Sequence, residues 1–97
     1  MNRQQVAHVL SAHRAELKRL GIGALSLFGS VVRNEATAAS DVDFLIEFDH
    51  PVGLFEFFRV QHRLEQLLGV EKVDLLTPAA IKPSLKQQIL SEAIRVA

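Results

Sequence analysis

The sequence has no cysteine, no net charge at neutral pH and no apolar run of membrane-spanning length. Without cysteine, the chain forms neither a disulfide framework nor a thiolate zinc site. Eleven basic residues balance eleven acidic ones, which argues against a broad cationic surface for nucleic acid. The polar N-terminus, MNRQQVAHVL, contains no apolar signal segment. We therefore expect a cytoplasmic protein that binds neither membranes nor nucleic acid directly.

The composition that remains is typical of one small globular domain. Hydrophobic residues make up 48% of the chain and charged residues 23%, a balance that indicates a folded rather than a disordered protein. A chain of 97 residues can bury one core but not two. We therefore predict a single domain over residues 1–97.

Apolar periodicity predicts alternating helices and strands. The predicted helices cover residues 3–20, 54–68 and about 84–95, with short helical turns from Ser30 and Pro78. The predicted strands cover residues 22–29, 41–48 and 71–77. About three strands and four helices indicate an α/β fold, a two-layer domain with a small sheet whose one face is covered by helices.

Two aspartates, one residue apart, begin the predicted strand 41–48. Strand residues two apart point the same way and lie roughly 6.6 Å apart, so Asp41 and Asp43 share the face opposite the apolar residues. Two neighbouring carboxylates repel each other unless a cation compensates. Carboxylates on a rigid strand suit Mg²⁺, which takes one or two of them and completes its shell with water and phosphate oxygens. The pair therefore predicts a Mg²⁺ site, although Asp41 taken alone could merely begin a strand.

A third carboxylate, Asp74, lies in the predicted strand 71–77, with Val73 and Leu75 on the opposite face. If this strand lies beside strand 41–48, Asp74 reaches the same edge of the sheet. Three carboxylates can hold two metal ions about 3.5 to 4 Å apart, which clamp the attacking and leaving oxygens of an in-line displacement. An exposed aspartate on an edge strand can also be without a catalytic role, and both interpretations stay open.

The Gly29–Ser30 pair, at the end of strand 22–29, is typical of a phosphate-binding turn. Gly29 lets the backbone approach a ligand closely because it has no Cβ. Backbone amides at a helix start favour anions, and the Ser30 hydroxyl adds another donor. Arg33 either binds the triphosphate or pairs with a nearby carboxylate such as Glu35. Metal ions at the aspartates and amides at Gly29–Ser30 would hold opposite ends of one nucleoside triphosphate.

The spacing of these residues resembles the signature of a known family. Gly29–Ser30, ten residues and then Asp41-Val42-Asp43 is similar to the motif of the DNA polymerase beta-like nucleotidyltransferases. The longer string FGSVVRNEATAASDVDFLIEF, with VDLL later, resembles the minimal nucleotidyltransferase (MNT) subfamily, and the resemblance covers residues 22–77. Asn34 stands where many relatives carry glycine, but asparagine tolerates the left-handed backbone conformation better than most residues.

The resemblance implies a two-layer nucleotidyltransferase fold with a small mixed sheet of about three strands. It also implies ATP as the donor substrate and two Mg²⁺ ions as cofactors. It implies that Asp41, Asp43 and Asp74 are the catalytic metal ligands. It also implies that Gly29 and Ser30 bind the phosphates. Members of this subfamily are often the antitoxin of a HEPN/MNT toxin–antitoxin module. The chain would then be a protein adenylyltransferase that transfers AMP from ATP to a tyrosine of a HEPN-type toxin.

Two other functions stay open. The chain could neutralise a partner by binding alone, or it could transfer a nucleotide to another acceptor, such as a small-molecule hydroxyl or an RNA end. The zero net charge and short length argue against RNA. Five intact site residues argue against a vestigial site: Gly29, Ser30, Asp41, Asp43 and Asp74. The four histidines show no metal-ligand spacing. Phe55, Phe57 and Phe58 cannot all face inward, so one could line the nucleotide pocket or a partner surface.

Overall fold

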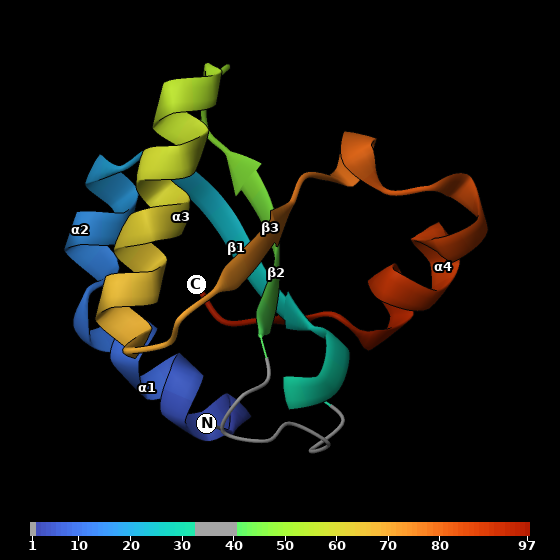
Figure 1. Ribbon diagram of the computed structural model, residues 1–97, viewed down its shortest axis with the longest axis horizontal. Helices are drawn as coiled ribbons and strands as arrows, with labels where there is room; N and C mark the ends of the chain where they lie inside the picture. The colour runs from blue at the N-terminus through green and yellow to red at the C-terminus, as the bar shows by residue number, and fades with distance from the viewer. Residues whose placement is uncertain (1, 33–40) are drawn as a thin grey trace.

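Strands from both halves of the chain form one mixed sheet in the computed structural model, which describes residues 2–32 and 41–97 (Figure 1). The strands are β1 (Ile22–Phe28), β2 (Val42–Phe48), β3 (Val73–Leu76) and β4 (Ile94–Arg95). Their order across the sheet is β3-β2-β1-β4. β1 is antiparallel to β2 and to β4, whereas β2 and β3 are parallel. The prediction of an α/β fold with a small mixed sheet is confirmed.

The helices lie on two sides of this sheet (Figure 1). They are α1 (Arg3–Ala12), α2 (Arg14–Arg19), α3 (Leu54–Leu68) and α4 (Pro83–Glu92), with 3₁₀ turns η1 (Gly29–Val31) and η2 (Pro78–Ala80). No helix in the described part of the chain is long and apolar enough to cross a membrane. In the view of Figure 1, α1, α2 and α3 lie together to the left of the sheet and α4 to the right. The predicted helical layer is thus formed by α1, α2 and α3.

One face of the sheet is buried against this layer. Val42, Phe44 and Ile46 alternate along β2, and each is at most 1% exposed. Buried residues of α1, β1 and α3 join the same core: Val6, Leu10, Leu25, Leu27, Val60 and Leu64. Burying one such side chain stabilises the fold by about 1.5 to 3 kcal/mol. The predicted core face of this strand is confirmed, so the residues between these three point to the other face.

The single helix predicted over residues 3–20 is wrong, because the chain breaks at His13. Its backbone conformation (φ −115°, ψ 23°) is not helical, and its N–H donates to the carbonyl of Leu10 rather than one residue further back. The break redirects α2 so that Leu17 is buried, with 3% of its surface exposed. Neither glycine nor proline marks this position, so the local sequence does not show the break. Asn2 is the N-cap of α1, because its side-chain Oδ1 accepts a hydrogen bond from the backbone N–H of Gln5 (2.8 Å).

The described part of the chain has one strand more than predicted. The last helix was predicted to extend to about residue 95, but α4 ends at Glu92 and β4 follows. Ile94 pairs with Leu27 across the edge of β1, and the Val96 N–H donates to the Leu25 carbonyl (2.9 Å). A strand of two residues is too short to show a period of two in the sequence. Tertiary pairing with β1 therefore determines this strand.

The three phenylalanines near the start of α3 face different environments, as predicted. Phe57 is half-buried and its ring packs against that of Phe48, with centroids 6.4 Å apart. Phe55 is 88% exposed and Phe58 53% exposed. Leu54, beside them, is 69% exposed. Three large apolar side chains at the beginning of α3 thus have little cover from the described part of the chain.

Candidate active site

The parallel pairing of β2 with β3 brings two of the predicted carboxylates side by side. Asp43 on β2 pairs directly with Asp74 on β3. Neighbouring strands lie about 4.8 Å apart, and paired residues point to the same face. The next pair along the ladder, Phe44 and Leu75, is buried, so the two aspartates point away from the core. The role predicted for Asp74 required these two strands to be neighbours, and they are.

Asp41 joins this group from the residue before β2. It therefore lies just outside the observed strand, although the predicted strand included it, and Lys72 links it to Asp74. The ammonium nitrogen of Lys72 lies 3.9 Å from Asp41 Oδ2 and 3.5 Å from Asp74 Oδ1. The Lys72 carbonyl accepts a hydrogen bond from the Val42 backbone N–H (3.3 Å), which places the lysine at the start of the β2–β3 ladder. One cation thus contacts two of the three carboxylates.

Gly29 lies directly against the remaining carboxylate. β1 ends at Phe28, which pairs with Asp43, and the chain then turns into η1 with Gly29 at φ +79°. A Cβ on Gly29 would overlap the Asp43 carboxylate and would lie 3.1 Å from its Cγ. Glycine is required here by the positive φ and by the space that this carboxylate occupies. The group that lies close to Gly29 in the described structure is the Asp43 carboxylate. The approach of a ligand to Gly29 stays a prediction.

The predicted helical turn from Ser30 is a single 3₁₀ turn, η1. Three residues contribute little to a helix dipole, which arises from many aligned peptide units. Any contact of this turn with phosphate would therefore depend on individual backbone N–H groups. Val31, 2% exposed, anchors the turn in the core. Arg33 lies outside the described residues, and its predicted role, like that of Ser30, stays a prediction.

The carboxylates suit a Mg²⁺ ion that arrives with a nucleotide better than one bound by protein alone. Within residues 2–32 and 41–97, no three histidine, cysteine, aspartate or glutamate side chains are gathered around a common metal position. Mg²⁺ usually takes one or two carboxylates and draws its other ligands from water and phosphate oxygens. Asp43 and Asp74, paired across the ladder, can supply two such carboxylates. The predicted binding of two ions by all three aspartates stays a prediction.

We call the group of Asp41, Asp43 and Asp74 the carboxylate edge. Lys72 lies beside it, and the sequence patterns did not predict this. Its side chain is 59% exposed, and those of Asp41 and Asp74 are 45% and 40% exposed. Ion pairs this open to solvent are weak and are screened by salt. The signal that could have revealed it is the spacing of Lys72 and Asp74, because residues two apart in a strand share a face.

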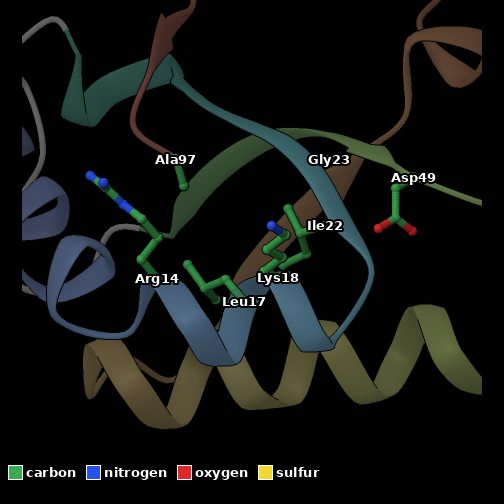
Figure 2. A pocket seen from close by; sticks show the side chains of 7 residues that line it. All are labelled: Arg14, Leu17, Lys18, Ile22, Gly23, Asp49 and Ala97. Atoms are coloured by element: carbon green, nitrogen blue, oxygen red, sulfur yellow. The ribbon is translucent and has the colours of Figure 1, made fainter.

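A pocket of about 330 Å³ lies between α2 and the first residues of β1 (Figure 2), away from Asp41, Asp43 and Asp74. The residues that line it are Arg14, Leu17, Lys18, Ile22, Gly23, Asp49 and Ala97. Gly23 and Gly29 are separated by the length of β1, roughly 20 Å at the usual rise per residue. This pocket is therefore separate from the carboxylate edge.

Comparison with known proteins identifies the family. Residues 10–96 match the family model of the nucleotidyltransferase domain. The chain belongs to this nucleotidyltransferase family. It is similar to the protein adenylyltransferase MntA of Thermococcus cleftensis, with 36% identity over 94 residues that cover 96% of this chain and 94% of the relative.

Solved structures agree with this assignment. A structure assigned provisionally as a minimal nucleotidyltransferase matches with a TM-score of 0.80 and 35% identity, covering 97% of this chain and 95% of that one. The crystal structure of a toxin–antitoxin complex with AMP-PNP matches with a TM-score of 0.68 over all of this chain and 73% of that one. At 18% identity, this second match shows a shared fold alone.

These comparisons confirm the resemblance to minimal nucleotidyltransferases, the fold class and the prediction of an enzyme that transfers nucleotides. They do not test the role of any single residue. The predicted functions of the three aspartates and of Gly29, Ser30 and Arg33 therefore stay predictions for this nucleotidyltransferase.

Proposed function

We propose that this nucleotidyltransferase is an ATP-dependent protein adenylyltransferase that serves as an antitoxin by transferring AMP to a tyrosine of a HEPN-type toxin. The observation that carries the proposal is the carboxylate edge, where Asp43 pairs with Asp74 beside Gly29 and Lys72 links Asp41 to the group. The relative from Thermococcus cleftensis is named a protein adenylyltransferase, which supports the transfer of AMP to a protein. The toxin–antitoxin complex with AMP-PNP supports both the partner and the donor.

The proposed reaction is a displacement at the α-phosphorus of ATP. The tyrosine oxygen attacks the α-phosphorus and forms a new P–O bond. The bond from the α-phosphorus to the oxygen that bridges to the β-phosphorus breaks, and pyrophosphate leaves with that electron pair. The phenol proton passes to water or to a carboxylate of the site. A phenol with a pKa of about 10 is a poor nucleophile at neutral pH, so its developing oxyanion needs a nearby positive charge.

Each residue of the edge has a distinct role in this proposal. Asp41, Asp43 and Asp74 bind Mg²⁺, which when bound stabilises the attacking oxyanion and the departing pyrophosphate. Asp43 lies between the other carboxylates and the turn at Gly29, so it joins the metal-binding side of the site to the phosphate-binding side. In the same proposal, backbone N–H groups of Gly29 and Ser30 hold the phosphates, and Arg33 adds a positive charge.

The toxin is proposed to dock on the exposed start of α3. Leu54, Phe55 and Phe58 form an apolar group of a kind that often marks a protein interface. This group follows the far end of β2, whereas Asp43 lies near its beginning, and Figure 1 shows the start of α3 and the start of β2 at opposite ends of the molecule. The separation argues against these phenylalanines lining the nucleotide site. They therefore fit the second predicted role, a surface for the partner.

The intact mass of the toxin tests the proposal. The toxin, purified and incubated with this protein, ATP and Mg²⁺, should gain the mass of one or more AMP units. The gain should disappear with Asp43→Asn or with excess chelator. Glu47→Gln is the matched control, because it removes an exposed carboxylate from the same strand and should leave transfer intact.

Two results would contradict the proposal. If the toxin is neutralised while its mass stays unchanged, binding alone is the mechanism. If the toxin stays unmodified while a small hydroxyl compound acquires AMP, the protein is a nucleotidyltransferase with a different acceptor.

A further inference from the structure

Lys72 lies where a cation would compensate the carboxylates of the site. Its ammonium nitrogen is 3.5 Å from Asp74 Oδ1 and 3.9 Å from Asp41 Oδ2, on two different segments of the chain. Asp43, the strand partner of Asp74, adds a third carboxylate to the same edge. Carboxylates on neighbouring strands repel each other, and a positive charge beside them offsets this repulsion.

The lysine backbone is fixed, but its side chain can move. The hydrogen bond from the Val42 N–H to the Lys72 carbonyl holds the main chain at the start of the ladder. The side chain is 59% exposed, and its flexible four-carbon stem carries a strongly hydrated ammonium group at the end. Its two ion pairs are open to solvent and therefore weak. A divalent cation can thus displace the ammonium without disturbing the strand pairing.

We infer that Lys72 is a counter-ion of Asp41 and Asp74 when no metal is bound, and that it couples the binding of metal to the binding of nucleotide. The inference rests on the proposed function only in that the aspartates bind Mg²⁺. Free Mg²⁺ must displace the ammonium from Asp41 and Asp74 and leave it without a partner. Mg²⁺ that arrives with a triphosphate brings phosphate oxygens, to which a lysine ammonium binds as a point charge. Lys72 therefore disfavours occupation of the site by the metal alone.

A purely structural role for Lys72 makes a different prediction. If the ion pairs only tie the start of β3 to Asp41, replacing the lysine lowers stability and leaves the affinity for metal unchanged. If Lys72 is a counter-ion, the affinity of the nucleotide-free protein for Mg²⁺ rises when the lysine charge is removed. Metal affinity, measured without nucleotide, separates the two roles.

The experiment is a titration with Mg²⁺ alone, followed by calorimetry and by the amide NMR signals of residues 41–43 and 72–74. Lys72→Met should lower the Kd for Mg²⁺ by about three- to tenfold, because a unit charge next to the metal position is lost. The affinity of this variant for ATP in the presence of Mg²⁺ should not rise by the same factor. The ratio of its affinity for the Mg²⁺–ATP complex to its affinity for free Mg²⁺ should therefore be smaller than in the wild type. Lys72→Arg retains the charge and should resemble the wild type. Lys86→Met, on the exposed surface of α4, is the control for removing a lysine elsewhere.

The outcomes separate this inference from the proposed function. An unchanged or weaker Mg²⁺ affinity in a folded Lys72→Met protein would overturn the role of Lys72 alone. If neither protein binds Mg²⁺, with or without ATP, both the inference and the proposed site are wrong. A second measurement needs no variant: the side-chain NMR signals of Lys72 in the wild type should shift as Mg²⁺ fills the site. Signals that stay unchanged at saturation would also overturn the inference.

Discussion

At the residue scale, Gly29 and Asp43 constrain each other. Gly29 adopts φ +79°, where side chains other than hydrogen are strained, and the Asp43 carboxylate occupies the space that a Cβ would need. The glycine of the motif therefore fixes the position of an aspartate in addition to leaving room for a ligand. A substitution at position 29 should affect the metal-binding side of the site as well as the phosphate-binding side.

The first prediction concerns Gly29→Ala. Alanine is strained at this positive φ, so the substitution should lower the free energy of unfolding by about 1 to 2 kcal/mol. The new methyl group should also displace the Asp43 carboxylate. We therefore expect binding of ATP with Mg²⁺ to weaken strongly, as measured by calorimetry beside urea unfolding. Gly69→Ala is the matched control, since Gly69 has φ +66° but no atom within 4 Å of the added Cβ. It should lose similar stability and keep its affinity for the nucleotide; if Gly29→Ala also keeps that affinity, the contact with Asp43 has no functional role.

At the scale of elements, a histidine ties the loop after β2 to the start of α3. The Nδ1 atom of His50 forms a hydrogen bond with Oδ1 of Asp49. The Nε2 atom of the same ring lies 3.3 Å from Oε2 of Glu56, in the first turn of α3. It also lies over Gly21, at the turn between α2 and β1. The cluster therefore lies where two loops and the beginning of α3 meet, close in sequence to the proposed docking group.

The hydrogen bond to Asp49, followed by that to Glu56, raises the pKa of His50 above its ordinary value. A second pocket is lined by His50 and Glu56 together with two cations, Arg19 of α2 and Arg59 of α3. A group whose pKa is raised by folding stabilises the native state fully below its unfolded pKa of about 6.5. That contribution is lost as the pH rises through the folded value.

The second prediction follows from this sign. The difference in melting temperature between the wild type and His50→Gln should be largest near pH 5.5 and should shrink as the pH rises above about 6.5. Thermal unfolding followed by circular dichroism over this range measures it. His8→Gln, an exposed histidine on α1, is the control and should show no such trend. A difference that is independent of pH would mean that protonation of His50 does not contribute to the stability of this loop.

At the scale of the whole molecule, the sequence predicted the parts with strong local signals. The apolar stripe of α3 and the alternation along β2 predicted a helix over 54–68 and the buried face of Val42, Phe44 and Ile46. The break at His13 and the short β4 could not be predicted, because packing on the sheet and pairing with β1 determine them. Local periodicity indicates which face is apolar, but it does not show where a chain returns to an open strand edge.

In the site, too, features with a local sequence signal were predicted and features that depend on tertiary contacts were not. The type and spacing of Gly29, Asp41 and Asp43 predicted a metal and phosphate site, and the register of β2 with β3 then brought Asp74 to the same edge. The contact of Asp43 with Gly29 and the position of Lys72 required three segments distant in sequence to meet. Such contacts depend on the register of the sheet, which a single sequence does not state.

The central claim is that Asp41 and Asp43 bind a nucleotide through Mg²⁺. An ATP titration with and without Mg²⁺ tests this claim most directly. The wild type should bind ATP well only when Mg²⁺ is present. Asp41→Asn/Asp43→Asn should lose this binding, because the variant lacks two of the charged oxygen ligands that Mg²⁺ requires. Glu47→Gln, with an exposed carboxylate removed from the same strand, should bind as the wild type does. Equal, metal-dependent affinity in the double variant would contradict the account, since the nucleotide would then bind elsewhere.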